Sequence, residues 1–156
     1  MRKILFFMLA ILLMVSSNSC KKDKTDTSGD TSTGFSAKVG GTSWTAKSVI
    51  ATEYTGPSTI IVAIGSTASE TMTLHIGGAA NGTYKVTANN NMCEGNIGDY
   101  FSTYFSDVPV GQIVITKYDL TNKLVSGTFT FDASSSGSTV YHVTEGKFDN
   151  VPLTVF

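Results

Sequence analysis

The side chains able to do acid–base or nucleophilic chemistry are few, since the chain has 2 His and 2 Cys in 156 residues. His75 and His142 each alternate with apolar neighbours, which predicts that both lie on the polar face of a β-strand. A catalytic role would pair one of them with a carboxylate such as Glu70 or Glu145. The favoured alternative is that both are solvated strand residues, because no motif brings either beside a nucleophile.

Residues 89–99 gather Asn and acidic side chains, whose oxygens suit Ca²⁺. They lack the regular acidic spacing of a Ca²⁺-binding loop, and a long exposed loop would have the same composition. Cys93 has no partner if Cys20 is modified, which predicts a buried free thiol. The aromatic residues that follow border a ligand surface or, more often, enter the core: Tyr100, Phe101, Tyr104 and Phe105. No metal or cofactor is expected, and no nucleotide-binding or serine-hydrolase motif occurs.

Cys20 suggests a different chemistry, the attachment of lipid to a thiol. Arg2 and Lys3 precede an apolar run of twelve residues, 4–15, and small polar residues then lead to Cys20. This run is shorter than the roughly 18 residues of a membrane-spanning helix, so it predicts an export signal over residues 1–19. Acyl chains on Cys20 would anchor the chain to a membrane. The alternative is an ordinary export signal with an unmodified Cys20.

Residues 20–34 are predicted to comprise Cys20 and a flexible tether. The segment that follows Cys20, KKDKTDTSGDTSTG, has no apolar side chain to bury. The folded domain is expected over residues 35–156. From Cys20 onward the chain has 9 basic and 12 acidic residues, and this slightly negative charge excludes nucleic acid as a partner.

The predicted domain alternates apolar and polar side chains with the period of a β-strand. Residues 111–132 are expected to form a β-hairpin with Asn122 in its turn, and the apolar run at residues 60–64 predicts a strand covered on both faces. Further strands are expected at residues 35–39, 44–54, 72–76, 84–88, 101–105, 140–145 and 151–155. The 22 Thr residues suit the solvated faces of such strands.

About nine or ten short strands separated by Gly and Asn turns predict an all-β fold. The favoured architecture is an antiparallel β-sandwich. A closed lipocalin-like β-barrel is the alternative, because the pattern alone does not decide whether the sheet closes.

Three phrases of the predicted domain resemble a known family: FSAKVGGTSWTA at residues 35–46, ITKYDLTNKLVSGTFTFDA at 115–133 and VTEGKFDNVPL at 143–153. The chain is similar to an uncharacterised family of small Bacteroidetes-type outer-membrane lipoproteins, a domain of unknown function. The resemblance extends over most of residues 35–155 and rests on packing and turn residues. It implies a β-rich exported lipoprotein and brings no assigned activity.

Together these features predict a lipid-anchored protein of the cell envelope, held at the outer membrane through Cys20 on its periplasmic face or at the cell surface. Its expected role is a non-enzymatic binding or structural module, with a glycan, a peptide or an envelope protein as ligand. The alternative role is a small cell-envelope hydrolase that uses His75 or His142 with a nearby carboxylate.

Overall fold

The computed structural model describes residues 33–56, 58–87, 90–103, 110–135 and 139–156. These residues confirm the all-β prediction, because they contain eleven strands and no helix. No helix in this part of the chain has the length and apolarity needed to cross a membrane. The strands are β1 (Gly34–Val39), β2 (Thr42–Thr45), β3 (Ser48–Tyr54), β4 (Ser58–Ile64), β5 (Thr71–Ile76), β6 (Gly82–Val86), β7 (Cys93–Ile97), β8 (Asp99–Ser102), β9 (Gly111–Asp119), β10 (Leu124–Ser134) and β11 (Val140–Val155).

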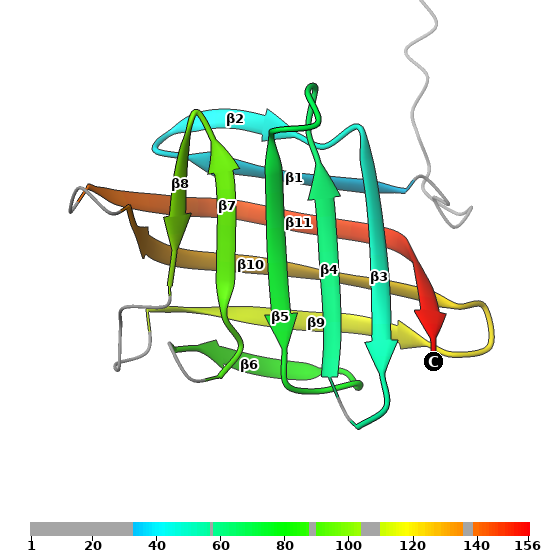
Figure 1. Ribbon diagram of the computed structural model, residues 1–156. Helices are drawn as coiled ribbons and strands as arrows, with labels where there is room; N and C mark the ends of the chain where they lie inside the picture. Colours follow the sequence, from blue (N-terminus) through cyan, green and yellow to red (C-terminus); the bar gives the residue numbers. More distant parts are fainter. Residues whose placement is uncertain (1–32, 57, 88–89, 104–109, 136–138) are drawn as a thin grey trace, which may run out of the picture. The chain divides into compact units, whose positions relative to one another are not determined.

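The strands form two layers (Figure 1). The front layer has the order β3-β4-β5-β7-β8, and the back layer has the order β2-β1-β11-β10-β9-β6. The back strands run crosswise to the front strands (Figure 1). The predicted hairpin is confirmed as β9 and β10, although Lys123 rather than Asn122 takes the left-handed turn conformation, with φ of 54°.

The two layers are continuous at two corners. Residues 153–155 of β11 pair in parallel with residues 51–53 of β3, while Ser134 of β10 pairs with Ser102 of β8. All other strand pairs are antiparallel, so one parallel pairing makes the sheet mixed. The ring of pairings through β3, β4, β5, β7, β8, β10 and β11 gives the sandwich a barrel-like connection.

Residues 44–54 form two strands instead of the single predicted one. The backbone N–H of Ala46 donates to the Phe35 carbonyl at 2.9 Å, and the next N–H, of Lys47, donates to the Ile64 carbonyl at 2.8 Å. The chain therefore changes layers between these two residues. Conversely, the two strands predicted at residues 140–145 and 151–155 are parts of one long strand, β11.

The strand at residues 60–64 is covered on one face only, so the two-sided prediction was wrong. Ile61 and Ala63 are fully buried, whereas Ile60 and Val62 are half-buried and Ile64 is exposed on the outer side. No described segment lies over that outer side. β4 therefore gives the front layer an apolar outer surface.

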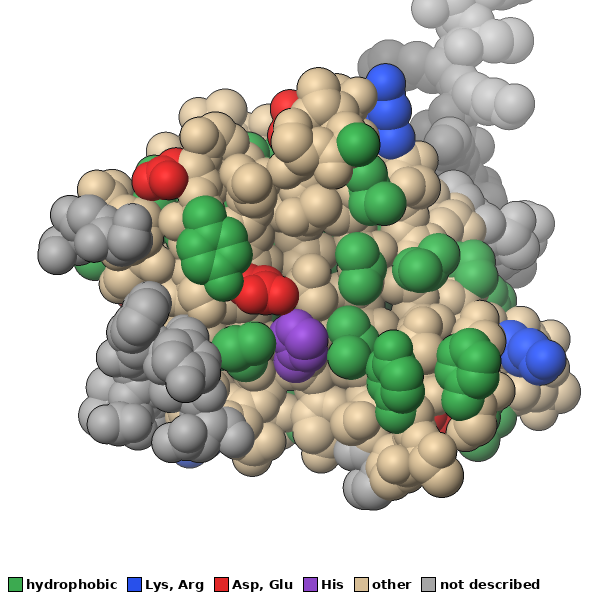
Figure 2. Space-filling model, in the orientation of Figure 1, with side chains coloured by type: hydrophobic (Ala, Val, Ile, Leu, Met, Phe, Trp, Pro, Cys, Tyr) green, Lys and Arg blue, Asp and Glu red, His purple; other side chains and the backbone are tan. Residues whose placement is uncertain are grey.

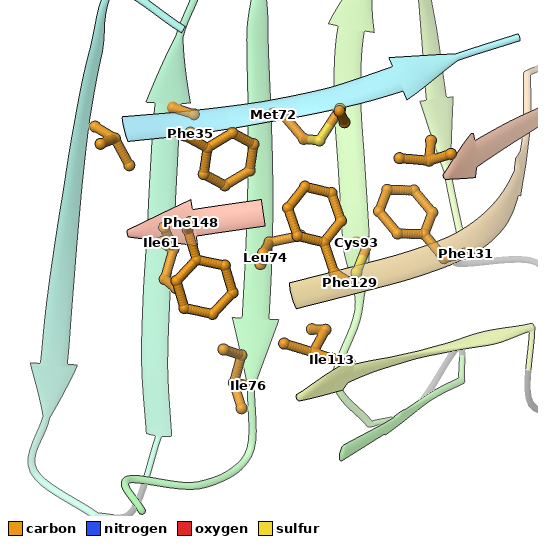
Figure 3. Packing of buried hydrophobic residues seen from close by; sticks show 14 of the residues in the cluster. Phe35, Ile61, Met72, Leu74, Ile76, Cys93, Ile113, Phe129, Phe131 and Phe148 are labelled. Atoms are coloured by element: carbon orange, nitrogen blue, oxygen red, sulfur yellow. The ribbon is translucent and has the colours of Figure 1, made fainter. Parts of the chain in front are cut away.

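The core lies between the layers (Figure 3). The back layer supplies aromatic rings, with Phe35 packed 5.0 Å from Phe129 and 6.5 Å from Phe148 between ring centroids. The front layer supplies smaller side chains that face these rings: Ile61, Met72, Leu74, Ile76 and Cys93. Full burial of such a side chain contributes about 1.5–3 kcal/mol.

A polar contact also joins the layers. The Tyr118 hydroxyl on β9 donates to Glu53 Oε2 on β3 at 2.8 Å and lies 3.2 Å from Thr59 Oγ1 on β4. Thr59 in turn donates to the Gly78 carbonyl at 2.9 Å. Burial, aided by Glu53, raises the pKa of Tyr118 to about 12 despite the opposing Thr59 contact. The phenol is therefore held protonated, as a donor.

Candidate functional site

The outward side chains of β3, β4, β5, β7 and β8, called the front face below, include several large uncovered apolar groups. Ile50 is 58% exposed, Tyr54 48% and Tyr100 51%, and Ile64 on β4 is 40% exposed. Figure 2 shows hydrophobic side chains gathered over β3 and β4, with histidine and acidic side chains next to them. Contiguous apolar surface of this kind is typical of a binding site.

The front face also has a polar cluster, which the pairing of β5 with β7 positions. His75 lies on β5, and its backbone N–H donates to the carbonyl of Met92, just before β7, at 2.8 Å. His75 Nε2 is 3.5 Å from Glu94 Oε1, and the Tyr100 hydroxyl donates to Glu94 Oε2 at 2.9 Å. Partial burial and the bond to Glu94 raise the pKa of Tyr100. The cluster combines an imidazole, a carboxylate and a phenol.

A groove of about 350 Å³ opens beside this cluster. Its lining includes Ser58, Ile60, His75, Gly77, Asn90 and Met92. Asn91 fixes one wall, because its Oδ1 accepts the Gly77 N–H at 2.7 Å and its Nδ2 donates to the Lys85 carbonyl at 2.8 Å. Asn91 has a left-handed φ of 54°, which Asn tolerates better than most residues. These hydrogen bonds of Asn91 hold the backbone that forms this wall of the groove.

The groove and its cluster favour hydrogen bonding over metal or anion binding. No three His, Cys, Asp or Glu side chains converge among the described residues in a way that could hold a metal ion. The five front strands contain Glu53, Glu94 and Asp99 but no Lys or Arg. A polyanion would therefore meet no basic partner on these strands.

Both histidines lie on solvent-facing strand positions, as predicted, but they occupy different layers. His142 is on the outer side of the back layer, with Nδ1 2.7 Å from Asp132 Oδ1 on the neighbouring strand β10. Its side chain is 66% exposed. His75 alone of the two lines the groove described above.

The expected carboxylate partners of the histidines were wrong. Glu145 makes an ion pair with Lys38 at 2.7 Å. Glu70 accepts the backbone N–H of Ser66 at 3.0 Å and the Trp44 indole N–H at 3.3 Å, and these bonds, led by that of Ser66, lower its pKa. The carboxylates that contact the two histidines, Glu94 and Asp132, lie on neighbouring strands. The spacing of residues along the sequence does not reveal which strands are neighbours.

Cys93 is a buried free thiol, as predicted. Burial, with a smaller contribution from Glu94, raises its pKa well above the usual value. Since the thiolate is the reactive form, Cys93 is a poor nucleophile at neutral pH. Cys20, the predicted lipid attachment site, lies outside the described residues, so its modification stays a prediction.

Residues 93–97 and 99 are strand, so the prediction of a loop at residues 89–99 was wrong there, and Asn89 lies outside the described residues. β7 begins at Cys93, and Gly98, with φ of 79°, makes the turn into β8. Of the aromatic residues that follow, Tyr100 lies on the front face and Phe101 is fully buried. Ala88, Tyr104 and Phe105 lie outside the described residues. The sequence signal for Glu94 would have been its alternation with Cys93 and Gly95.

The fold and site define an all-β domain with an uncovered apolar face and a polar groove. The chain belongs to the family of the domain of unknown function DUF6252, whose model matches residues 31–152. This match includes every strand except the last residues of β11. No curated protein and no solved structure matches the chain.

Proposed function

We propose that this protein is an exported lipoprotein of the outer membrane that acts as a non-enzymatic binding module. The observation that carries the binding role is the front face, where Ile50, Tyr54 and Tyr100 are about half exposed without a covering segment among the described residues. Leaving large apolar groups in water has a free-energy cost, which a ligand or partner would remove by covering them.

The anchoring role is supported by the sequence from Met1 to Cys20. A positive start, a short apolar run and a thiol after small residues fit an export signal followed by a lipidated cysteine. The resemblance to outer-membrane lipoproteins points the same way. Residues 21–34 would then act as a polar tether between the lipid and the folded domain, at the periplasmic face or the cell surface.

Replacing the lipidated thiol tests the anchor. Cys20→Ala is expected to abolish incorporation of labelled fatty acid and to move the protein out of the membrane fraction. Cys93→Ala is the matched control, because it removes the buried thiol and leaves Cys20 in place. Fatty-acid labelling and membrane partitioning that are unchanged in Cys20→Ala would overturn the lipoprotein assignment.

Site-specific photo-crosslinking in intact cells tests the binding role. A photoreactive amino acid at Ile50 on the front face is expected to give discrete crosslinked products. The same group at Thr128, an exposed outward position on β10 of the back layer, serves as the control. Equal crosslinking at both positions, or none at either, would contradict a specific binding face.

A hydrolase is the second candidate, and the observation that favours it is His75 in a groove with Glu94 at 3.5 Å. A carboxylate beside an imidazole can orient it as a general base. This role predicts hydrolysis of an ester, peptide or glycoside substrate that His75→Ala abolishes. His142→Ala is the control, because its pair with Asp132 lies on the back layer.

A further inference from the structure

We infer that the front-face groove beside His75 binds an uncharged oligosaccharide. This inference rests on the proposed binding role and names its ligand class. A sugar chain offers hydroxyl groups that both donate and accept hydrogen bonds, together with apolar C–H faces. The groove and its borders present the counterparts of both features.

The charge of the front layer selects against an anionic ligand. Its five strands contain neither Lys nor Arg. Of their three acidic residues, Glu94 lies on the front face, whereas Glu53 and Asp99 accept hydrogen bonds from Tyr118 and Tyr141 of the back layer. Figure 2 shows Lys and Arg side chains only near the margins of this view. An acidic polysaccharide would therefore approach the Glu94 carboxylate without a nearby compensating cation on these strands.

The polar groups of the groove have hydrogen-bonding capacity that a sugar would use. His75 Nε2 lies 3.5 Å from Glu94 Oε1 and makes no hydrogen bond to any described residue, although the His75 side chain is 34% exposed. Glu94 accepts the Tyr100 hydroxyl through Oε2, and a carboxylate has acceptor sites for further donors. Ser58 and Asn90 add a hydroxyl and an amide to the lining. Adjacent hydroxyls of one sugar ring could thus be bound by imidazole, carboxylate and amide together.

Strands on either side of the groove carry exposed tyrosine rings. Tyr54 on β3 is the cross-strand partner of Ser58, which lines the groove, and its ring stacks on Phe156 with centroids 6.3 Å apart. Tyr100 on β8 is held by its bond to Glu94. β3 and β8 are separated by three intervening strands, so at about 4.8 Å per step these two strands lie roughly 19 Å apart across the sheet. This span suits an oligosaccharide with sugar faces stacked on the rings rather than a single sugar.

An apolar peptide is the competing ligand, because Ile50, Val62 and Ile64 lie on the same face. Within the groove, however, an apolar side chain would leave the imidazole of His75 and the amide of Asn90 without partners. Burying such groups unsatisfied costs about 1–3 kcal/mol each. The lining therefore favours a hydroxyl-rich ligand.

The test uses the full lipidated chain in detergent, titrated by isothermal calorimetry with cellohexaose, laminarihexaose, mannohexaose and chitohexaose, and with heparin as an anionic control. At least one neutral hexaose is expected to bind with a Kd below about 1 mM, and heparin is expected not to bind. Tyr100→Ala and Glu94→Gln should each weaken binding by about tenfold. Tyr100→Phe, which keeps the ring, should have a smaller effect. Thr128→Ala on the back layer should have none, and an unchanged Tm shows that each variant is folded.

The glycan assignment is overturned if no neutral hexaose binds, if heparin binds equally well, or if the groove variants bind like Thr128→Ala. A parallel titration with a short alternating Leu-Lys peptide separates this failure from failure of the proposed function. Binding of that peptide in place of the hexaoses would reject the glycan and retain a binding face. If photo-crosslinking at Ile50 also matches that at Thr128, both the glycan assignment and the binding role fall.

Discussion

The front and back layers expose outer faces that differ in how their charged side chains are paired. The back layer pairs most of its charges locally, through Lys38–Glu145, Lys147–Asp149, Lys117–Asp119 and His142–Asp132. The front face has a single pair of this kind among the described residues, His75–Glu94. Its remaining outward positions are largely aliphatic, aromatic, hydroxyl or amide groups. The back face therefore has more of its charged side chains in local pairs than the front face has, although Val140 on β11 is also about half exposed.

This difference resides in outward positions only, since both layers contribute to one core. On β10 the inward side chains include Phe129 and Phe131, and the outward ones are Thr128, Thr130 and Asp132. On β4 the inward side chains include Ile61 and Ala63, and the outward ones still include three apolar residues, Ile60, Val62 and Ile64. Inward positions therefore specify the fold, and outward positions are free to carry function.

The largest effect on stability is expected from removing an aromatic ring from the core between the two layers. Phe129 is 1% exposed and packs against Phe35, Phe131 and Phe148. Phe129→Ala should lower the free energy of unfolding by about 3–5 kcal/mol through lost burial and a cavity. Ile50→Ala on the front face, measured by the same denaturant titration, should change it by no more than about 0.5 kcal/mol. Similar losses for the two variants would show that the front face is part of the core.

Two tyrosine–glutamate bonds offer a closer comparison of core-linking and surface contacts. Tyr118 donates to Glu53 between the layers at 2.8 Å, and Tyr100 donates to Glu94 on the front face at 2.9 Å. Tyr118→Phe should destabilise the protein by about 1–2 kcal/mol, because Glu53 and Thr59 lose a partly buried partner. Tyr100→Phe should cost less than about 0.5 kcal/mol, because water can replace its hydroxyl. A larger loss for Tyr100→Phe in chemical denaturation would assign the front cluster a structural role.

The same link predicts how stability depends on alkaline pH. The pKa of Tyr118 is about 12 in the folded protein and 10.0 ordinarily, so the native state holds this proton more tightly than the unfolded state. The stabilisation is fully present below pH 10 and is lost as pH rises through about 12. Urea titrations across this window should show a steeper decline for the wild type than for Tyr118→Phe. Parallel declines would mean that other groups, such as Tyr100 and Tyr141 with their raised pKa values, dominate.

Local patterning was enough to predict the hairpin of β9 and β10, because its alternation and its turn lie within one continuous stretch of chain. It failed where a glycine is required by close packing against a residue that is distant in the sequence. The strand predicted at residues 140–145 was expected to end before Gly146, but Gly146 lies inside β11, where the Phe129 ring and backbone leave no space for a side chain. Likewise, Gly95 lies under the Phe101 ring, which allows β7 to form from a segment with the composition of a loop.

The candidate site was only partly predictable for a related reason. His75 was recognised, but its partner Glu94 depends on β7 pairing with β5 while β6 lies at the far edge beside β9. The strand order cannot be obtained from alternation, because several orders would bury the same inward residues. The apolar front face was also not predicted. The apolar run at residues 60–64 is compatible with a strand buried on both faces and with one buried on a single face, and among the described residues only the inner face is covered.

The smallest effect is expected from the back-face ion pairs. Lys38 and Glu145 have side chains 39% and 67% exposed, and such a pair contributes about 0.2–1 kcal/mol. A double-mutant cycle with Lys38→Met and Glu145→Gln should give a coupling energy in this range, and it should shrink in about 1 M salt, where the screening length is about 3 Å. A coupling energy that is large and insensitive to salt would mean that the back face holds β1 against β11. The back pairs would then be structural, and their contrast with the front face would reflect differing stability requirements as much as differing function.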